Sequence, residues 1–236
     1  MDVFKTKKFD ITQEQNVIKV NTDAILLAAW TDYGKADSIL DIGTGTGIIA
    51  LIAAQKSDAK EIVGIEISEK CAQEAKVNFE GSLYASTLKV VCDRIQDFAK
   101  FSLEKYALII SNPPFFSGGT FSDNENKHNV KHSPKLSVGD LLIAVRKLMK
   151  PDGRFTIVLP YLEGERFIDM AARYDLYPDN IMEIRNKKNN PIERLLISLK
   201  FDTSAGNIIR KDFCMYDEDD RYTSAYLEMT EDILIP

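Results

Sequence analysis

Three closely spaced glycines follow a short apolar run early in the chain. The segment Ser38-Ile-Leu-Asp-Ile-Gly-Thr-Gly-Thr-Gly47 leads into a second apolar stretch, residues 48–54. This pattern predicts a strand, a tight turn and a helix. Glycine permits positive φ and lets a ligand lie on the backbone, while the helix N-terminus attracts polar groups. Glu66 ends the next apolar run and can accept hydrogen bonds from a ribose. These residues predict a nucleoside-binding site.

The glycine spacing alone leaves two classes of nucleoside open. Gly45-x-Gly47-x-x-Ala50 also fits the fingerprint of dinucleotide-binding turns. Asp41 argues against a dinucleotide, because its carboxylate would lie where the pyrophosphate should be. A carboxylate there suits a cationic ligand with an amino group, such as S-adenosylmethionine. We therefore expect S-adenosylmethionine, with NAD as the alternative.

A second candidate group is Asn112-Pro-Pro-Phe115, directly after an apolar run at residues 107–110. Consecutive prolines cannot extend a strand and have no N–H, so the carbonyls of this turn should face outward as acceptors. The Asn112 side chain adds another carbonyl acceptor. Two neighbouring acceptors suit a planar amine with two N–H bonds. Phe115 could stack on a flat ring, which is worth about 1–3 kcal/mol.

The elements that must position these residues form a regular series. Strand and helix patterns alternate from residue 38 to residue 174 and end in a hairpin, which predicts a doubly wound, mostly parallel α/β sheet with helices on both faces. Seven strands are predicted, the last one antiparallel, at residues 38–42, 61–67, 88–92, 107–110, 155–159, 181–184 and 195–201. Ligands collect outside the carboxyl ends of such strands. The glycine loop, Glu66, Asp93 and Asn112 should therefore converge there.

Residues before the glycine loop form their own segment. Residues 24–30 are apolar nearly all round, which predicts a buried helix capped by Asn21 or Thr22. Residues 1–8 are basic, and we expect them to be flexible.

The motifs resemble those of class I S-adenosylmethionine-dependent amino-methyltransferases in order and spacing over residues 15–160. More narrowly, residues 19–30, 95–98 and 111–116 resemble the bacterial family that methylates N6 of the adenine just 3′ of the anticodon in a valine tRNA. That family commonly has glycine where this chain has Asn21.

The resemblance implies a Rossmann-like fold, S-adenosylmethionine as cofactor and tRNA as substrate. The implied catalytic residues are Asn112, Pro113, Pro114 and Phe115. The implied cofactor-binding residues are Lys19, Thr22, Asp41, Gly43, Gly45, Gly47, Glu66, Ile67, Asp93, Arg94 and Asn112. Direct methyl transfer needs neither a metal nor a covalent intermediate, so no metal site is expected. His128 and His132 are expected to face solvent or phosphate rather than act as bases.

Other functions remain open on these residues. Related enzymes that methylate guanine N2 in ribosomal RNA or a glutamine amide in a protein share the Asn112–Phe115 tetrapeptide. A non-catalytic RNA-binding relative is a further alternative, although such a protein need not keep Asp41, Glu66 and Asn112 together.

Composition and charge limit the class of protein. A chain of 236 residues, 44% hydrophobic and 28% charged, is typical of a soluble globular protein. We expect one domain, with an extension at 1–35, a core at 36–203 and a second extension at 204–236. No signal-peptide core or membrane-length apolar run appears, so we expect a cytoplasmic protein with no membrane partner. Cys71, Cys92 and Cys214 lack metal-ligand spacing, and we expect them to be buried free thiols. We also expect a monomer.

The net charge of −6 is unevenly distributed. Residues 127–154 and 185–211 each carry +5, whereas residues 212–236 carry −7. The two basic segments predict one face that holds the RNA backbone, masked in the total by the acidic tail.

Overall fold

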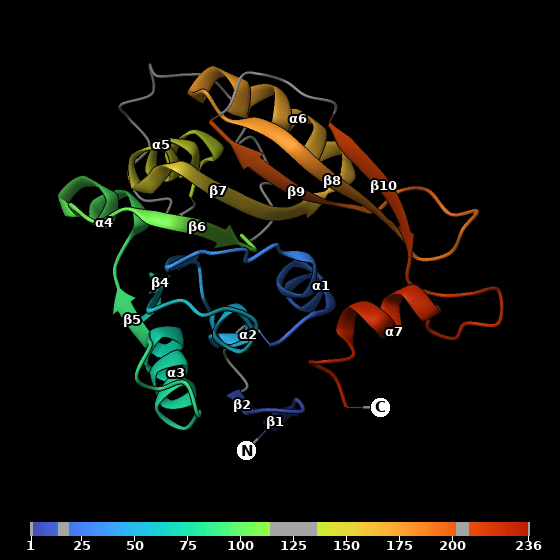
Figure 1. Cartoon of the computed structure of the whole chain (residues 1–236), viewed down its shortest axis with the longest axis horizontal. Coiled ribbons are helices and arrows are strands. Elements are labelled where there is room, and N and C mark those ends of the chain that lie inside the picture. Colours follow the sequence, from blue (N-terminus) through green and yellow to red (C-terminus); the bar gives the residue numbers. More distant parts are fainter. Residues whose placement is uncertain (1, 14–18, 114–135, 202–207, 236) are drawn as a thin grey trace.

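Eight strands form one mixed sheet in the order β10-β8-β9-β7-β6-β3-β4-β5 (Figure 1). The computed structural model describes residues 2–13, 19–113, 136–201 and 208–235. The strands of this sheet are β3 Ser38–Ile42, β4 Glu61–Glu66, β5 Leu88–Cys92, β6 Tyr106–Ser111, β7 Met149–Pro160, β8 Tyr177–Arg185, β9 Arg194–Lys200 and β10 Ile209–Cys214. Strand β9 is antiparallel to β7 and β8, and all other neighbouring pairs are parallel.

Helices cover both faces of the sheet (Figure 1). They are α1 Thr22–Trp30, α2 Ile48–Lys56, α3 Glu69–Glu80, α4 Ile95–Phe101, α5 Val138–Leu148, α6 Tyr161–Ala171 with the 3-10 turn Ala172–Tyr174, and α7 Ser224–Thr230. Helices α1, α2, α3 and α7 share one hydrophobic core, and α4, α5 and α6 share the other. The predicted doubly wound α/β class is confirmed.

The central strands are apolar on both sides because both faces of the sheet are covered. Along β3, Ile39 packs into the core of α1 and α2, while Leu40 packs into the core of α4 and α5. Leu108 and Ile109 divide in the same way in β6. All four side chains are fully buried. Because alternate residues point into two covered faces, both sets are apolar, and these runs contain almost no polar residue.

Each of the seven predicted strands is present, and the structure adds further elements. Strand β10 extends the sheet to eight strands by pairing parallel with β8, and α7 follows it. Helix α4 was not predicted, because its seven residues are too few for a clear helical period. The expectation of a flexible N-terminus is wrong for the described residues, since β1 Asp2–Lys5 pairs antiparallel with β2 Asp10–Gln13.

The expectation that the cysteines are buried is wrong. The cysteines are free but not buried, because Cys92 is exposed and Cys71 and Cys214 are partly exposed. No helix in the described ranges has the length and apolar character to cross a membrane.

Candidate active site

The loop between β3 and α2 has the backbone conformation that its glycines permit. The φ angle is 74° at Gly43, 56° at Gly45 and 88° at Gly47, values that side-chain-bearing residues rarely adopt. A Cβ on Gly47 would overlap Cε1 of Phe79, so this glycine also permits close packing against α3. A Cβ on Gly43 would meet no described atom within 4 Å. The loop thus presents bare backbone with room for a ligand.

Asp41 lies beneath this loop at the end of β3. Its side chain is 0% exposed, and its Oδ2 accepts a hydrogen bond from the Thr44 hydroxyl at 2.7 Å. Its Oδ1 is buried and makes no hydrogen bond within the described ranges. Burial raises the pKa of Asp41 to about 7, opposed by the Thr44 hydroxyl and the Ala50 N–H and reinforced by the Glu66 charge. The cost of burying the ionised form of Asp41 therefore exceeds the stabilisation from its hydrogen bonds.

Glu66 joins β4 to the glycine loop. Its Oε2 accepts from the Gly45 N–H at 3.1 Å, and its Oε1 accepts from the Ser68 N–H at 2.9 Å. The side chain is held at the carboxyl edge of the sheet, and each oxygen keeps a second lone pair that a hydroxyl could use. Asp93 is next to it, because the Asp93 N–H donates to the Glu66 carbonyl at 3.0 Å. The predicted neighbourhood of the loop, Glu66 and Asp93 is present.

Asn112 lies beside this group at the end of β6. Strand β6 pairs with β3, and Ser111 is the register partner of Ile42. The buried Ser111 hydroxyl donates to the Ile42 carbonyl at 2.9 Å, just before Gly43. The start of the tetrapeptide is thereby fixed next to the start of the glycine loop. Pro113 is buried, and Asn112 is partly exposed.

The remaining predicted site residues lie after the ends of β4 and β5 and around the start of α1. Ile67 is 52% exposed after β4 and offers an apolar surface, and Arg94 is exposed before α4. Thr22 is exposed at the start of α1, where Asn21 and not Thr22 is the N-cap. Lys19 forms an ion pair with Asp2 at 2.7 Å. Residues 114 and 115 of the tetrapeptide and both histidines, at 128 and 132, lie outside the described residues.

Two residues that were not predicted from the sequence support the conformation of the glycine loop. Asn78 in α3 is 5% exposed; its Nδ2 donates to the Thr46 carbonyl at 2.8 Å, and its Oδ1 accepts from the Thr12 N–H at 2.9 Å. Gly64 in β4 makes room for Thr44, since a Cβ there would lie 2.8 Å from the Thr44 methyl carbon. The sequence signal for Asn78 was an asparagine inside a helical pattern.

The described donor and acceptor set fits an S-adenosylmethionine-type ligand. Asp41 and Glu66 place two carboxylates around the loop, which disfavours the phosphates of a dinucleotide and favours an ammonium group. The unpartnered Oδ1 of Asp41, the open backbone at Gly43 and the hydroxyl-binding capacity of Glu66 are the observations that support this fit.

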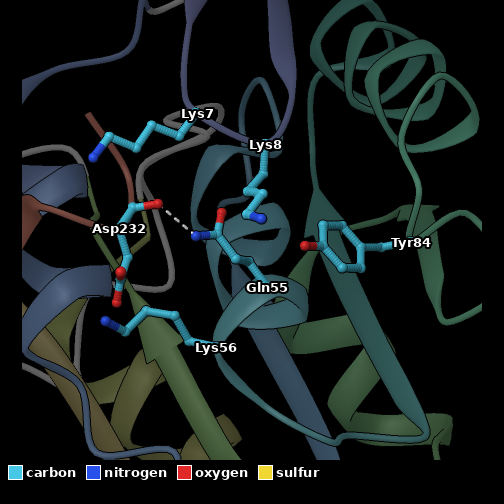
Figure 2. Close-up of a pocket in the computed structure, with 6 residues that line it drawn as sticks. All are labelled: Lys7, Lys8, Gln55, Lys56, Tyr84 and Asp232. Carbon is cyan, nitrogen blue, oxygen red and sulfur yellow. Dashed lines mark hydrogen bonds between the residues drawn. The ribbon is translucent and has the colours of Figure 1, made fainter. Parts of the chain in front are cut away.

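Two cavities of about 480 Å³ lie elsewhere. One is lined by Lys7, Lys8, Gln55, Lys56, Tyr84 and Asp232, with Gln55 Nε2 donating to the Asp232 carbonyl (Figure 2). The other is formed largely by the segments that precede β3 and begin β7. Gln55 and Lys56 end helix α2, which begins directly after the glycine loop, and the second cavity is lined by residues that precede β3. Both cavities therefore lie at the opposite edge of the sheet from the glycine loop. Among the described residues, no three His, Cys, Asp or Glu side chains group as metal ligands would.

Of the predicted basic face, residues 127–135 lie outside the described residues, and the described cations of the first segment and the turn after β8 lie at different edges of the sheet. Described cations of the first segment lie at the amino edge of the sheet, where Lys150 pairs with Asp37 and Arg154 with Asp32. The turn after β8 lies at the carboxyl edge, the edge of the sheet that also carries the candidate site. There Lys187 pairs with Asp220 of the acidic tail at 2.8 Å.

Comparison with known proteins agrees with this geometry. Residues 16–159 match the model of the methyltransferase small domain family. A tRNA1(Val) (adenine(37)-N6)-methyltransferase of Pectobacterium carotovorum is 32% identical over 99% of this chain and 94% of its own length. A protein of the same name from Bacteroides fragilis (strain YCH46) is 38% identical over 84% of each chain.

Solved structures show the same fold at low sequence identity. A predicted O-methyltransferase of Agrobacterium tumefaciens superposes with a TM-score of 0.66 at 17% identity, over 89% of this chain and 96% of that one. A methyltransferase of Pyrococcus furiosus has a TM-score of 0.59 at 17% identity, over 82% and 89% of the two chains. The chain therefore belongs to the methyltransferase small domain family.

Proposed function

We propose that this protein transfers a methyl group from S-adenosylmethionine to N6 of an adenine in tRNA, the adenine next to the anticodon of a valine tRNA. The names of relatives that align over nearly the whole chain support this substrate. The observation that carries the proposal is the placement of Asn112 beside the glycine loop, through the Ser111 hydroxyl and the pairing of β6 with β3.

The residues that would hold the cofactor lie along one edge of the sheet. Gly43 and Gly45 would contact it through backbone, Glu66 would accept from its ribose hydroxyls, and Asp93 from its adenine amine. Asp41 would favour its ammonium group. S-adenosylmethionine supplies a methyl group already activated by the positive sulfur. Contacts from Lys19, Thr22, Ile67 and Arg94 remain part of this proposal.

The chain's own contribution to the chemistry is to orient the target amine. The lone pair of adenine N6 is delocalised into the ring, so the nitrogen is a weak nucleophile. Asn112 Oδ1 and the Pro113 carbonyl can each accept one of its N–H bonds, which draws the nitrogen toward a tetrahedral shape and raises its lone-pair density. Such preorganised acceptors act mainly on the transition state. Pro114 and Phe115 complete the proposed site, with Phe115 stacking on the target base.

The substrate must leave its stack to reach this turn. Extruding a base costs a few kcal/mol, and the cost is smallest in a loop such as the anticodon arm. We propose that residues 1–236 act as one methyltransferase domain and that the turn after β8 contacts the RNA backbone. A cytoplasmic location and a monomeric state remain predictions.

The test is to incubate the protein with a valine tRNA transcript and S-adenosylmethionine and then to analyse the nucleosides by mass spectrometry. N6-methyladenosine is expected. A matched transcript with guanine in place of the target adenine should yield no product. If the tRNA stays unmodified, the same incubation with ribosomal RNA or with a protein substrate tests the alternatives: N2-methylguanosine or methylated glutamine would then establish one of those activities. Binding of tRNA and cofactor without any methylation would indicate a non-catalytic relative.

A further inference from the structure

The side chain of Asn112 is held by a residue 91 positions away in the sequence. Asn112 Nδ2 donates a hydrogen bond to Asn21 Oδ1 at 3.3 Å. Asn21 is the N-cap of α1, and its Oδ1 also accepts from the Ala24 N–H at 2.9 Å. In Figure 1 the arrow of β6 ends beside α1, so two distant parts of the chain meet at the candidate site.

The helix end determines which way both amides face. A backbone N–H can only donate, so the Asn21 atom that meets the Ala24 N–H must be the carbonyl oxygen. That oxygen has a second lone pair and lies next to the Asn112 amide, so the Asn112 atom that faces it must be the NH₂ group. Oδ1 is then the polar atom of the Asn112 amide that remains to face a substrate.

Helix α1 is a firm support for this contact. Its residues 24–28 are buried. Near its start, Asp23 accepts from Arg194 Nε of β9 at 3.0 Å. At its end, the Thr31 hydroxyl lies 3.2 Å from the Thr156 hydroxyl of β7. A side chain held by a secondary element that is fixed at both ends is positioned more accurately than one on a free loop.

We propose that Asn21 is a positioning residue for methyl transfer, which keeps Asn112 turned with its acceptor toward the target amine. An Asn112 amide rotated by half a turn would present NH₂ to an amine N–H, and two donors cannot bond. This inference rests on the proposed function, in which Asn112 Oδ1 accepts from that amine. Asn21 contacts Asn112 and not the reacting atoms, so its effect reaches the reaction through the Asn112 amide.

The test is single-turnover methyl transfer to a valine tRNA transcript by the full chain. Asn21→Gly removes the acceptor, and glycine is a tolerated N-cap that costs little helix stability. We expect the rate at saturating tRNA and cofactor to fall about threefold to tenfold, the range for losing one neutral hydrogen bond. The affinities for tRNA and for S-adenosylhomocysteine should stay within about twofold of wild type. Asn21→Asp keeps an acceptor for both N–H groups and should retain most of the rate.

A double-mutant cycle separates positioning from a general effect on α1. In an Asn112→Ala background, Asn21→Gly should slow the reaction no further, whereas damage to the helix would slow both backgrounds equally. Full rate in Asn21→Gly, an equal loss in Asn21→Asp, or additive losses in the cycle would overturn the positioning role. Full rate in Asn112→Ala would instead refute the proposed role of Asn112 itself. A thermal melt of each variant checks that it is folded.

Discussion

Replacing Asp41 by asparagine should stabilise the free protein at alkaline pH and weaken its binding of the cofactor. The carboxylate is 0% exposed, and one of its oxygens has no hydrogen-bond partner in the described ranges. Its pKa is raised from 3.8 to about 7. At 1.36 kcal/mol per pH unit, holding this group ionised in the fold costs about 4 kcal/mol.

The sign of the pH effect follows from the raised pKa. The folded protein binds this proton more tightly than the unfolded chain, so stability falls as pH rises from about 4 to about 7, and above pH 7 the full cost is present. Asparagine removes the charge and can still accept from Thr44, although its NH₂ group would be buried without a partner, which costs about 1–3 kcal/mol. We therefore expect Asp41→Asn to gain about 1–3 kcal/mol at pH 8 and nothing at pH 5.

Urea unfolding at pH 5 and pH 8 measures this difference, with Asp93→Asn as the matched control. Asp93 is a partly exposed carboxylate at the same edge, so its replacement should give no gain at pH 8. Calorimetry with S-adenosylhomocysteine should show wild-type affinity rising between about pH 6 and pH 8 as Asp41 ionises, and weaker, pH-independent affinity in Asp41→Asn. Equal destabilisation of Asp41→Asn at both pH values would refute the reasoning, because the charge would then carry no cost in the fold.

Further substitutions test the other contacts of the site. Glu66→Ala should weaken S-adenosylhomocysteine binding by about 1.5–3 kcal/mol, the range for hydrogen bonds to a charged group, and unchanged binding by calorimetry would exclude a ribose contact. Lys188→Ala, which removes an exposed cation, should reduce the slope of log affinity for tRNA against log salt by about one unit. Lys187→Ala should change that slope less, because Asp220 already pairs with Lys187; equal effects in filter binding would contradict this. Asn78→Ala breaks a buried bridge to the glycine loop and should lower the free energy of unfolding by about 2–4 kcal/mol, so a variant with wild-type urea unfolding would show that the bridge contributes nothing.

The sequence by itself determined the parts of this protein that depend on local pattern. Three glycines at alternate positions after an apolar run require a turn with positive φ, and the structure has that turn at Gly43, Gly45 and Gly47. Alternating strand and helix patterns predicted a sheet covered by helices on both faces, and all seven predicted strands are present. Because parallel strands end at one edge, the meeting of Glu66, Asp93 and Asn112 could also be predicted without coordinates.

The tertiary structure decided everything that depends on which distant residues touch. The basic segments looked alike in the sequence, yet the described cations of the first lie at the amino edge of the sheet, whereas the turn after β8 in the second lies at the carboxyl edge, where Lys187 pairs with Asp220 of the acidic tail. No local signal shows that Asn78 donates to the Thr46 carbonyl, or that Asn112 donates to the Asn21 side chain that caps α1. Hydrogen bonds of this kind leave no periodicity in the chain, because they depend on the packing of α1 and α3 around the sheet and not on spacing along the sequence.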